Sequence, residues 1–311
     1  MCLVCPAIIF ALPDGIDKNT SSSISHLIMG GLYENTGEID KAIEEYKRVA
    51  KIDSESSLIH FNLAAAYIKK KDIPSAISEL NTASKIEPEA VEPHAILALL
   101  YSSQNKLKEA SSEYELALKN ASKQQPKNAE IYKTLGFIYL QQKKYKEALD
   151  TYKLLVEITP DDPQVHLYLG STYNELKDNK QAEVELKRAI ELKPDYHEAL
   201  NYLGYLYVEE NKNLDQAENL IKKALELSPE NGAYIDSLGW LYFKRGRLQE
   251  ALKELDRAAT LIEDPVVYEH LGDVYLKLKN PQKAKTSWES SLKLDPEQES
   301  VKKKLEELIK K

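Results

Sequence analysis

Small and hydrophobic residues recur along the chain with a period of about 34 residues, which is longer than a single helix or strand. Leu-Gly pairs end at Gly136, Gly170, Gly204, Gly239 and Gly272 and follow this period to within one residue. If this glycine is numbered position 8, every one of eight successive units has tyrosine at position 11 and alanine at position 20. The tyrosines are Tyr33, Tyr67, Tyr101, Tyr139, Tyr173, Tyr207, Tyr242 and Tyr275, and the alanines are Ala42, Ala76, Ala110, Ala148, Ala182, Ala217, Ala251 and Ala284.

The pattern in each unit predicts two helices, each with one apolar face. Positions 7, 8 and 11 are spaced i, i+1, i+4 and form one face of a first helix. Position 20, a large residue at 24 and a mostly small one at 27 line a second helix, as in Ala251, Leu255 and Ala258. The small residues allow the two helices to approach closely, and the large ones fill the space beside them. Proline near the end of the second helix prevents it from continuing. These prolines are Pro88, Pro160, Pro194, Pro229 and Pro296.

This pattern resembles the tetratricopeptide repeat, a helix–turn–helix unit of about 34 residues, over residues 23 to about 298. The resemblance implies an all-α fold: an α-solenoid of eight repeats in a right-handed superhelix. We expect the repeats at about 23–56, 57–90, 91–128, 129–162, 163–196, 197–231, 232–264 and 265–298. Extra residues around "KQQP" after unit 3 and in "ENKNLDQA" of unit 6 are expected at turns, where insertions cost little. Residues 299–311 have apolar residues at helical spacing and predict a capping helix.

Residues 1–22 precede the repeats and are expected to form an apolar leader and a polar linker. The run Leu3–Leu12 is typical of the apolar segment of an export signal. No lysine or arginine precedes it, Pro6 lies inside it, and Cys5 follows Leu-Val where a lipoprotein signal has small residues. A truncated export signal and a disordered N-terminus both remain open. The first predicts a bacterial periplasm or envelope protein, and the second a cytoplasmic one.

The last three units show a narrower resemblance. Residues 199–258 and 264–292 are similar to the C-terminal half of bacterial envelope tetratricopeptide lipoproteins. Those proteins act as adaptors, for example by delivering substrates to carboxy-terminal processing proteases. The resemblance implies an adaptor that assists proteolysis or the assembly of complexes in the envelope.

Candidate catalytic and metal-binding residues are few. His26, His60, His94 and His166 all occupy position 4, so they should lie at least one helix layer apart, too far to share a metal ion. Cys2-x-x-Cys5 has no second pair of ligands. We therefore expect packing histidines, no metal and no cofactor. The absence of Ser-His-Asp, Cys-His and nucleotide-binding glycine patterns predicts that the chain is not an enzyme.

Net charge and hydropathy exclude some classes of binding partner. The formal charge of −8 argues against binding to nucleic acid. No apolar run reaches the roughly 20 residues that an integral membrane span requires. The remaining partner class is protein or peptide.

In this repeat family, positions 2, 5, 9, 12 and 13 of the first helix face a concave groove that binds ligands. Carried over by resemblance, the groove is apolar and aromatic toward the N-terminal half and more acidic toward the C-terminal end. Exposed residues of these kinds are typical of protein contacts. Alternatively, positions 9 and 12 pack against the neighbouring first helix. The paired lysine and asparagine or arginine of the chaperone-tail clamp are not present as a pattern. The expected groove residues are Leu27, Phe61, Lys69, Lys133, Phe137, Asn174, Asn201, Tyr205, Asp236, Trp240, Phe243 and Asp273.

The leading hypothesis is a non-enzymatic scaffold or adaptor that binds a peptide or helix of a partner protein in the concave groove. One alternative is a regulatory or targeting module of an enzyme such as a glycosyltransferase. A second is a self-assembling scaffold that forms a homo-oligomer through the groove or the first hairpin.

Overall fold

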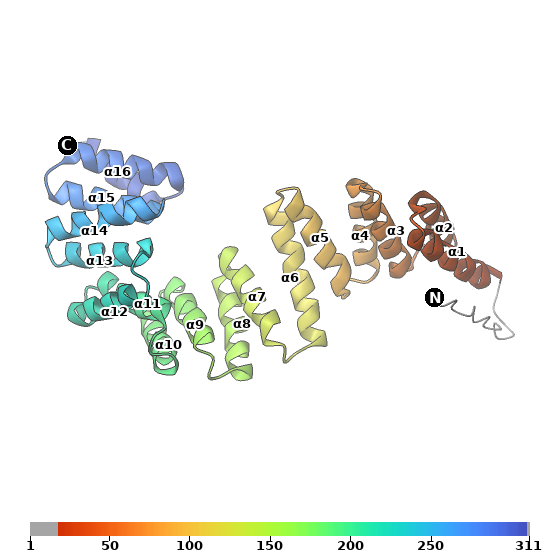
Figure 1. Ribbon diagram of the computed structural model, residues 1–311, viewed down its shortest axis with the longest axis horizontal. Helices are drawn as coiled ribbons and strands as arrows, with labels where there is room; N and C mark the ends of the chain where they lie inside the picture. Colours follow the sequence, from red (N-terminus) through yellow and green to blue (C-terminus); the bar gives the residue numbers. More distant parts are fainter. Residues whose placement is uncertain (1–17, 310–311) are drawn as a thin grey trace, which may run out of the picture. The chain divides into compact units, whose positions relative to one another are not determined.

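The computed structural model describes residues 18–309, which form seventeen α-helices and no strand (Figure 1). The predicted all-α class is confirmed, and the helices correspond to eight hairpins followed by one more helix. Residues 1–17, which include both cysteines and the apolar run, lie outside the described residues. Two compact units divide the chain, residues 1–138 and residues 139–311.

The N-terminal unit contains six complete helices and most of a seventh. The helix α7 spans Ala129–Gln141 and continues into the C-terminal unit. Within the N-terminal unit, α1 packs on α2, α3 on α4 and α5 on α6. The other helices are α1 (Lys18–Asn35), α2 (Ile39–Ile52), α3 (Ser57–Lys69), α4 (Ile73–Ile86), α5 (Val91–Ser103) and α6 (Leu107–Gln124).

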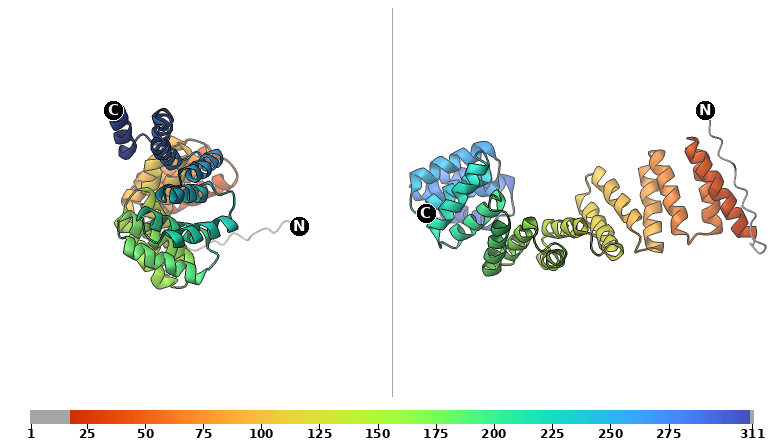
Figure 2. Two further views of the ribbon diagram at one scale, coloured as in Figure 1. Left: turned by 90° about the vertical axis from the view of Figure 1, so that its left-hand side faces the viewer. Right: turned by 60° about the horizontal axis from the view of Figure 1, so that its bottom comes forward.

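The C-terminal unit contains the remaining helices, and Figures 1 and 2 show them stacked side by side. Each second helix also packs on the first helix of the next hairpin, as α12 does on α13. The helices are α8 (Tyr145–Ile158), α9 (Pro163–Glu175), α10 (Asn179–Leu192), α11 (His197–Glu209), α12 (Leu214–Leu227), α13 (Gly232–Lys244), α14 (Leu248–Leu261), α15 (Pro265–Lys277), α16 (Pro281–Leu294) and α17 (Glu299–Ile309).

Two helices are longer than the repeat predicts. α1 begins at Lys18, so residues 18–22, expected to be a polar linker, are helical. No proline or glycine interrupts this run, and its polar side chains can remain in water. α6 has 18 residues, whereas α4 has 14. The extra residues after unit 3 therefore extend α6 through Gln124 instead of enlarging a turn, which corrects the sequence-based expectation.

Position 8 lies where the two helices of a hairpin come closest. A Cβ atom on Gly170 would lie 2.7 Å from Cγ of Leu186, and one on Gly239 would lie 2.7 Å from Cγ of Leu255. Both leucines occupy position 24 of their units. Such separations are shorter than any normal carbon contact, so in these two hairpins a side chain at position 8 would force the leucine to move. This contact accounts for the fixed spacing between positions 8 and 24.

The turn between the two helices begins in the same way in every hairpin. Position 15 has positive φ in all eight, with glycine in two and Lys or Asn in the others, such as Lys177 at 63°. The next amide donates to the carbonyl of the position-11 tyrosine, for example Asp178 N to Tyr173 O at 2.9 Å. This is the left-handed ending that commonly closes helices. In unit 6, Asn213 (φ 49°) is a second left-handed residue and accommodates the extra residue in the turn, as expected.

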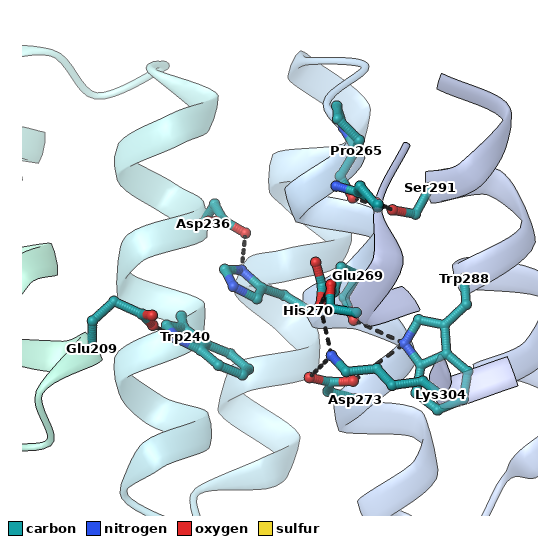
Figure 3. Close-up of polar contacts among 12 residues, drawn as sticks. Glu209, Asp236, Trp240, Pro265, Glu269, His270, Asp273, Trp288, Ser291 and Lys304 are labelled. Atoms are coloured by element: carbon teal, nitrogen blue, oxygen red, sulfur yellow. Dashed lines mark hydrogen bonds and ion pairs between the residues drawn. The ribbon is translucent and has the colours of Figure 1, made fainter. Parts of the chain in front are cut away.

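The last helix, α17, covers the end of the array. Val301 is fully buried and packs in one cluster with Ala284 and Trp288 of α16. Nζ of Lys304 lies 2.7 Å from carboxylate oxygens of both Glu269 and Asp273 (Figure 3). The cap is therefore held by an apolar contact and by an ion pair to α15.

Gly30 and Gly31 provide a matched test of the position-8 contact. A Cβ on Gly30 would overlap the ring of Tyr46, whereas the nearest atom to one on Gly31 is the Tyr46 hydroxyl, 3.9 Å away. We expect Gly30→Ala to lower the free energy of unfolding by about 1–3 kcal/mol, the usual cost of overpacking. Gly31→Ala should raise it by up to about 1 kcal/mol, because alanine favours helix. Urea unfolding of both variants measures the difference, and the reverse order would contradict this account of position 8.

Candidate binding surfaces

The first helices of the N-terminal unit leave large apolar side chains uncovered. Leu58 on α3 and Leu99 on α5 are each 58% exposed, and Phe137 on α7 is 52% exposed. The charged residues of α3 and α5 are also few, with one lysine on α3 and one glutamate on α5, apart from a histidine on each. Most of the exposed surface of these two helices is therefore apolar or uncharged.

A hollow of about 280 Å³ lies between the N-terminal ends of α3 and α5. The predicted groove residue Phe61 forms part of its wall together with Leu58 and Pro93. Two carboxylate residues, Glu87 and Glu92, also line it. The hollow is smaller than most small-molecule pockets, which span roughly 300–1,000 Å³. Its size and lining are suited to one apolar side chain.

Three other predicted residues of this unit have different surroundings. Leu27 is half-buried and packs against the core of the first hairpins. Nζ of Lys69 forms an ion pair with Glu34 at 2.7 Å. Lys133 lies on α7, one helical turn before the exposed Phe137, and is half-buried.

In the C-terminal unit, two predicted groove residues are buried. Trp240 is 7% exposed, and its ring stacks with those of Phe243 and His270, with centroid distances of 4.6 and 4.0 Å. Its Nε1 donates to Glu209 at 2.5 Å (Figure 3). Asp236 is 6% exposed, and its Oδ1 lies 2.9 Å from Nδ1 of His270.

The burial of Trp240 corrects the prediction that it anchors a partner. The helix α13 packs against α11 on one side and α15 on the other, so its groove positions face neighbouring helices. This is the alternative in which position 9 packs on the next first helix. Phe243 is half-buried against the Trp240 ring and belongs to the same stack.

Asp273 is also engaged within the chain. Its Oδ2 pairs with Lys304 of α17 at 2.7 Å, and its Oδ1 accepts a hydrogen bond from Trp288 Nε1 at 3.2 Å. Figure 3 shows these contacts on the side of α15 away from α13. Because Lys304 and Trp288 contact both carboxylate oxygens of Asp273, we do not include Asp273 in the binding surface.

The remaining predicted residues of this unit gather around a second hollow of about 280 Å³, between α11, α13 and the start of α15. Asn201 and Tyr205 line it, and so does Asp236 from the buried side. Asn174 lies next to it and donates from Nδ2 to the Tyr202 hydroxyl at 3.3 Å. The structure thus brings together four residues that sequence reasoning placed in one groove, of which Asn201, Tyr205 and Asp236 line the hollow.

Comparison with known proteins identifies the family. Residues 100–308 match the family model described as the Cilia and flagella-associated protein 70 C-terminal domain, a tetratricopeptide model. Residues 36–100 match the tetratricopeptide repeat itself. The chain belongs to the tetratricopeptide repeat family. No curated protein sequence matches it.

Solved tetratricopeptide structures resemble the chain in fold. A tetratricopeptide repeat protein from Parabacteroides merdae is 20% identical, with a TM-score of 0.64 over 81% of this chain and 98% of that one. The Cut9–Hcn1 hetero-tetramer of the APC/C gives 19% identity and a TM-score of 0.59, over 94% of this chain and 57% of that one. A thermophilic tetratricopeptide protein from Thermus thermophilus is 19% identical, with a TM-score of 0.53 over 58% of this chain and 99% of that one. At these identities the likeness concerns the fold alone.

Four of the tetratricopeptide hairpins share a histidine–glutamate side-chain contact that sequence reasoning missed. Nδ1 of the position-4 histidine lies between 2.5 Å and 2.7 Å from a glutamate carboxylate on the second helix of the same hairpin. In three of them, Nε2 also faces a backbone carbonyl that precedes the histidine, at 2.9–3.3 Å. The pairs are His26–Glu45, His60–Glu79, His94–Glu113 and His166–Glu185.

The histidines therefore connect the first and second helices of their hairpins. In unit 4, Tyr132 replaces the histidine and Thr151 replaces the glutamate. The Tyr132 hydroxyl donates to the carbonyl of Pro126. The constant separation between the histidine and the glutamate, the same in all four units, was the available signal in the sequence. Within residues 18–309, no group of three or more His, Cys, Asp or Glu residues could hold a metal ion. In the same part of the chain, no helix combines the length and apolar character of a membrane span.

Burial predicts that Trp240 matters for stability. We expect Trp240→Ala to lower the free energy of unfolding by about 3–5 kcal/mol, because it removes a large stacked side chain from the core. Tyr205→Phe removes only the hydroxyl of a residue that lines the hollow and should change stability by less than about 1 kcal/mol. Thermal and urea unfolding measure both variants. A Trp240→Ala protein as stable as the wild type would mean that the ring is not packed as described.

Proposed function

We propose that the chain is a protein–protein interaction scaffold whose N-terminal unit binds an apolar segment of a partner protein along α3, α5 and α7. The observation that supports this most directly is the exposure of Leu58, Leu99 and Phe137, each more than half open to solvent. All three occupy positions that line the ligand groove in tetratricopeptide proteins. Exposed apolar groups on one face are typical of protein contacts.

The chemistry of this surface favours an apolar segment over a charged one. Burying a leucine side chain fully stabilises a complex by about 1.5–3 kcal/mol, so covering the exposed part of Leu58 and Leu99 contributes roughly 1 kcal/mol each. The hollow beside Phe61 and Pro93 gives one apolar side chain of the partner a defined place. An amphipathic helix lying on these first helices, with one anchor in the hollow, matches a common mode of recognition.

The test is affinity capture from the source cell with the full chain as bait, followed by titration of the captured partner. Leu58→Asp with Leu99→Asp should weaken binding about 10- to 100-fold, corresponding to the loss of roughly 1.4–2.7 kcal/mol. Both residues are exposed, so the folded state should tolerate the change.

Leu107→Asp is the matched control. Leu107 is 65% exposed but lies at the start of α6, a second helix. It should leave binding unchanged. If the α3/α5 variant retains the partner, or if the control loses it equally, the proposed surface is wrong.

The envelope role stays a prediction. It rests on the resemblance of residues 199–292 to envelope adaptors and on an apolar run that lies outside the described residues. Cell fractionation tests it, and a native protein found wholly in the cytosol would contradict it. The enzyme-module and self-assembly hypotheses also stay predictions. Light scattering over a wide concentration range tests the second, because a strict monomer excludes a homo-oligomer.

A further inference from the structure

We infer that the C-terminal unit has a binding site of its own, in the hollow between α11, α13 and α15, which takes the side chain of a lysine or arginine from a partner protein. This inference rests on the proposed scaffold role. It does not depend on the apolar surface of α3 and α5, so the two can fail separately.

The walls of the hollow suit the stem of a long side chain. Aliphatic groups come from Ile262, Val266 and Val267, and aromatic rings come from Tyr202 and Tyr205. Lysine and arginine carry three or four methylene groups that pack on such surfaces while the charged end reaches polar partners. Aromatic rings beside a cation add further attraction. A volume of about 280 Å³ accommodates one side chain of this kind.

Several hydrogen-bond acceptors line the hollow, among them the side-chain oxygens of Asn201, Asp236 and Asp264. Oδ1 of Asn201 is buried and has no hydrogen-bond partner among the described residues. A buried acceptor without a partner is destabilising, and a donor from a ligand would remove that penalty. Two carboxylates also line the hollow, Asp236 and Asp264. Asp236 uses Oδ1 for His270, and Asp264 uses Oδ1 to accept from the Val266 amide at 2.8 Å.

The charged groups around the hollow also favour a cationic ligand. Burial, followed by the negative charges of Glu209, Asp236 and Glu269, raises the pKa of the Tyr205 hydroxyl. Of these carboxylates, Glu269 is already paired with Lys304, and Asp236 is hydrogen-bonded to His270. Glu209 accepts from the neutral indole of Trp240. The potential around the Tyr205 hydroxyl is therefore negative, which attracts a cation.

A carboxylate or phosphate group does not fit this site. No lysine or arginine is among the residues that line the hollow in the described part of the chain. An anion there would be desolvated beside Asp236 and Asp264 without a counter-charge, which is strongly unfavourable. The ends of lysine and arginine, by contrast, carry only donors, and arginine offers five in a fixed plane. The donor set of the ligand thus complements the acceptor set of the hollow.

The experiment is methyl NMR of the full chain with labelled isoleucine and valine. The probe is Nα-acetyl-L-arginine N-methylamide, and Nα-acetyl-L-citrulline N-methylamide is its neutral isostere. Both are titrated into the millimolar range, where a single side chain is expected to bind. We expect the arginine probe to shift the methyl signals of Ile262, Val266 and Val267. The citrulline probe should bind at least about 10-fold more weakly, because it lacks the charge.

Asp264→Asn is the decisive variant, because asparagine caps a helix as well as aspartate does but carries no charge. It should weaken binding of the arginine probe about 3- to 10-fold. Glu263→Gln is the matched control: Glu263 is adjacent and exposed, and it does not line the hollow. This variant loses the same charge and should bind as the wild type does.

Three results would overturn the site. They are an absence of shifts at these methyl groups, equal binding of the two probes, and equal weakening by Asp264→Asn and Glu263→Gln. The α3/α5 double variant should bind the arginine probe normally, so failure of the apolar surface and failure of this site are seen in different measurements.

Discussion

The close approach between position 8 of a first helix and position 24 of the second determines the shape of every hairpin. Where position 8 is glycine, the side chain at position 24 lies directly on its Cα, as Leu186 does on Gly170. Where it is alanine, as at Ala64, the residue is fully buried beside a leucine, Leu80. The rest of the hairpin follows from this contact, since the left-handed turn at position 15 must return the chain so that these two positions meet.

The two units offer different chemistry because their first helices are covered to different extents. In the C-terminal unit, α13 lies between α11 and α15, and most of its residues are buried, including the polar Asp236. What stays open there is a small hollow rich in acceptor atoms. In the N-terminal unit, α3 and α5 keep leucines in solvent. One array thus presents an apolar surface at one place and a hollow lined by carboxylates at another, without any change in its repeat.

The hairpins could be predicted from sequence because their contacts are local and repeated eight times. Positions 8, 11, 20 and 24 lie within one unit, so a single period reveals them. The burial of Trp240 could not be predicted in this way, since it depends on how closely three consecutive first helices pack. The family pattern assigns position 9 to the groove, but His270, on the first helix of the next hairpin, covers that ring. The histidine–glutamate pairs could have been predicted from the sequence, because both residues recur at the same spacing in four units.

The two irregular units differ in where they accommodate extra residues, and helix geometry explains the choice. Four additional residues turn a helix by about 400°, only about 40° beyond a full turn, so α6 can lengthen and keep the same face toward its neighbours. A single additional residue would rotate the following face by about 100°, and in unit 6 it is confined to the turn, at Asn213. The rotation per residue therefore limits which lengths of insertion a helix of this chain can accept. Insertions of one turn can enter a helix, whereas other lengths belong between helices, where peptide tags or reporter sequences can also be introduced without rotating the packed faces.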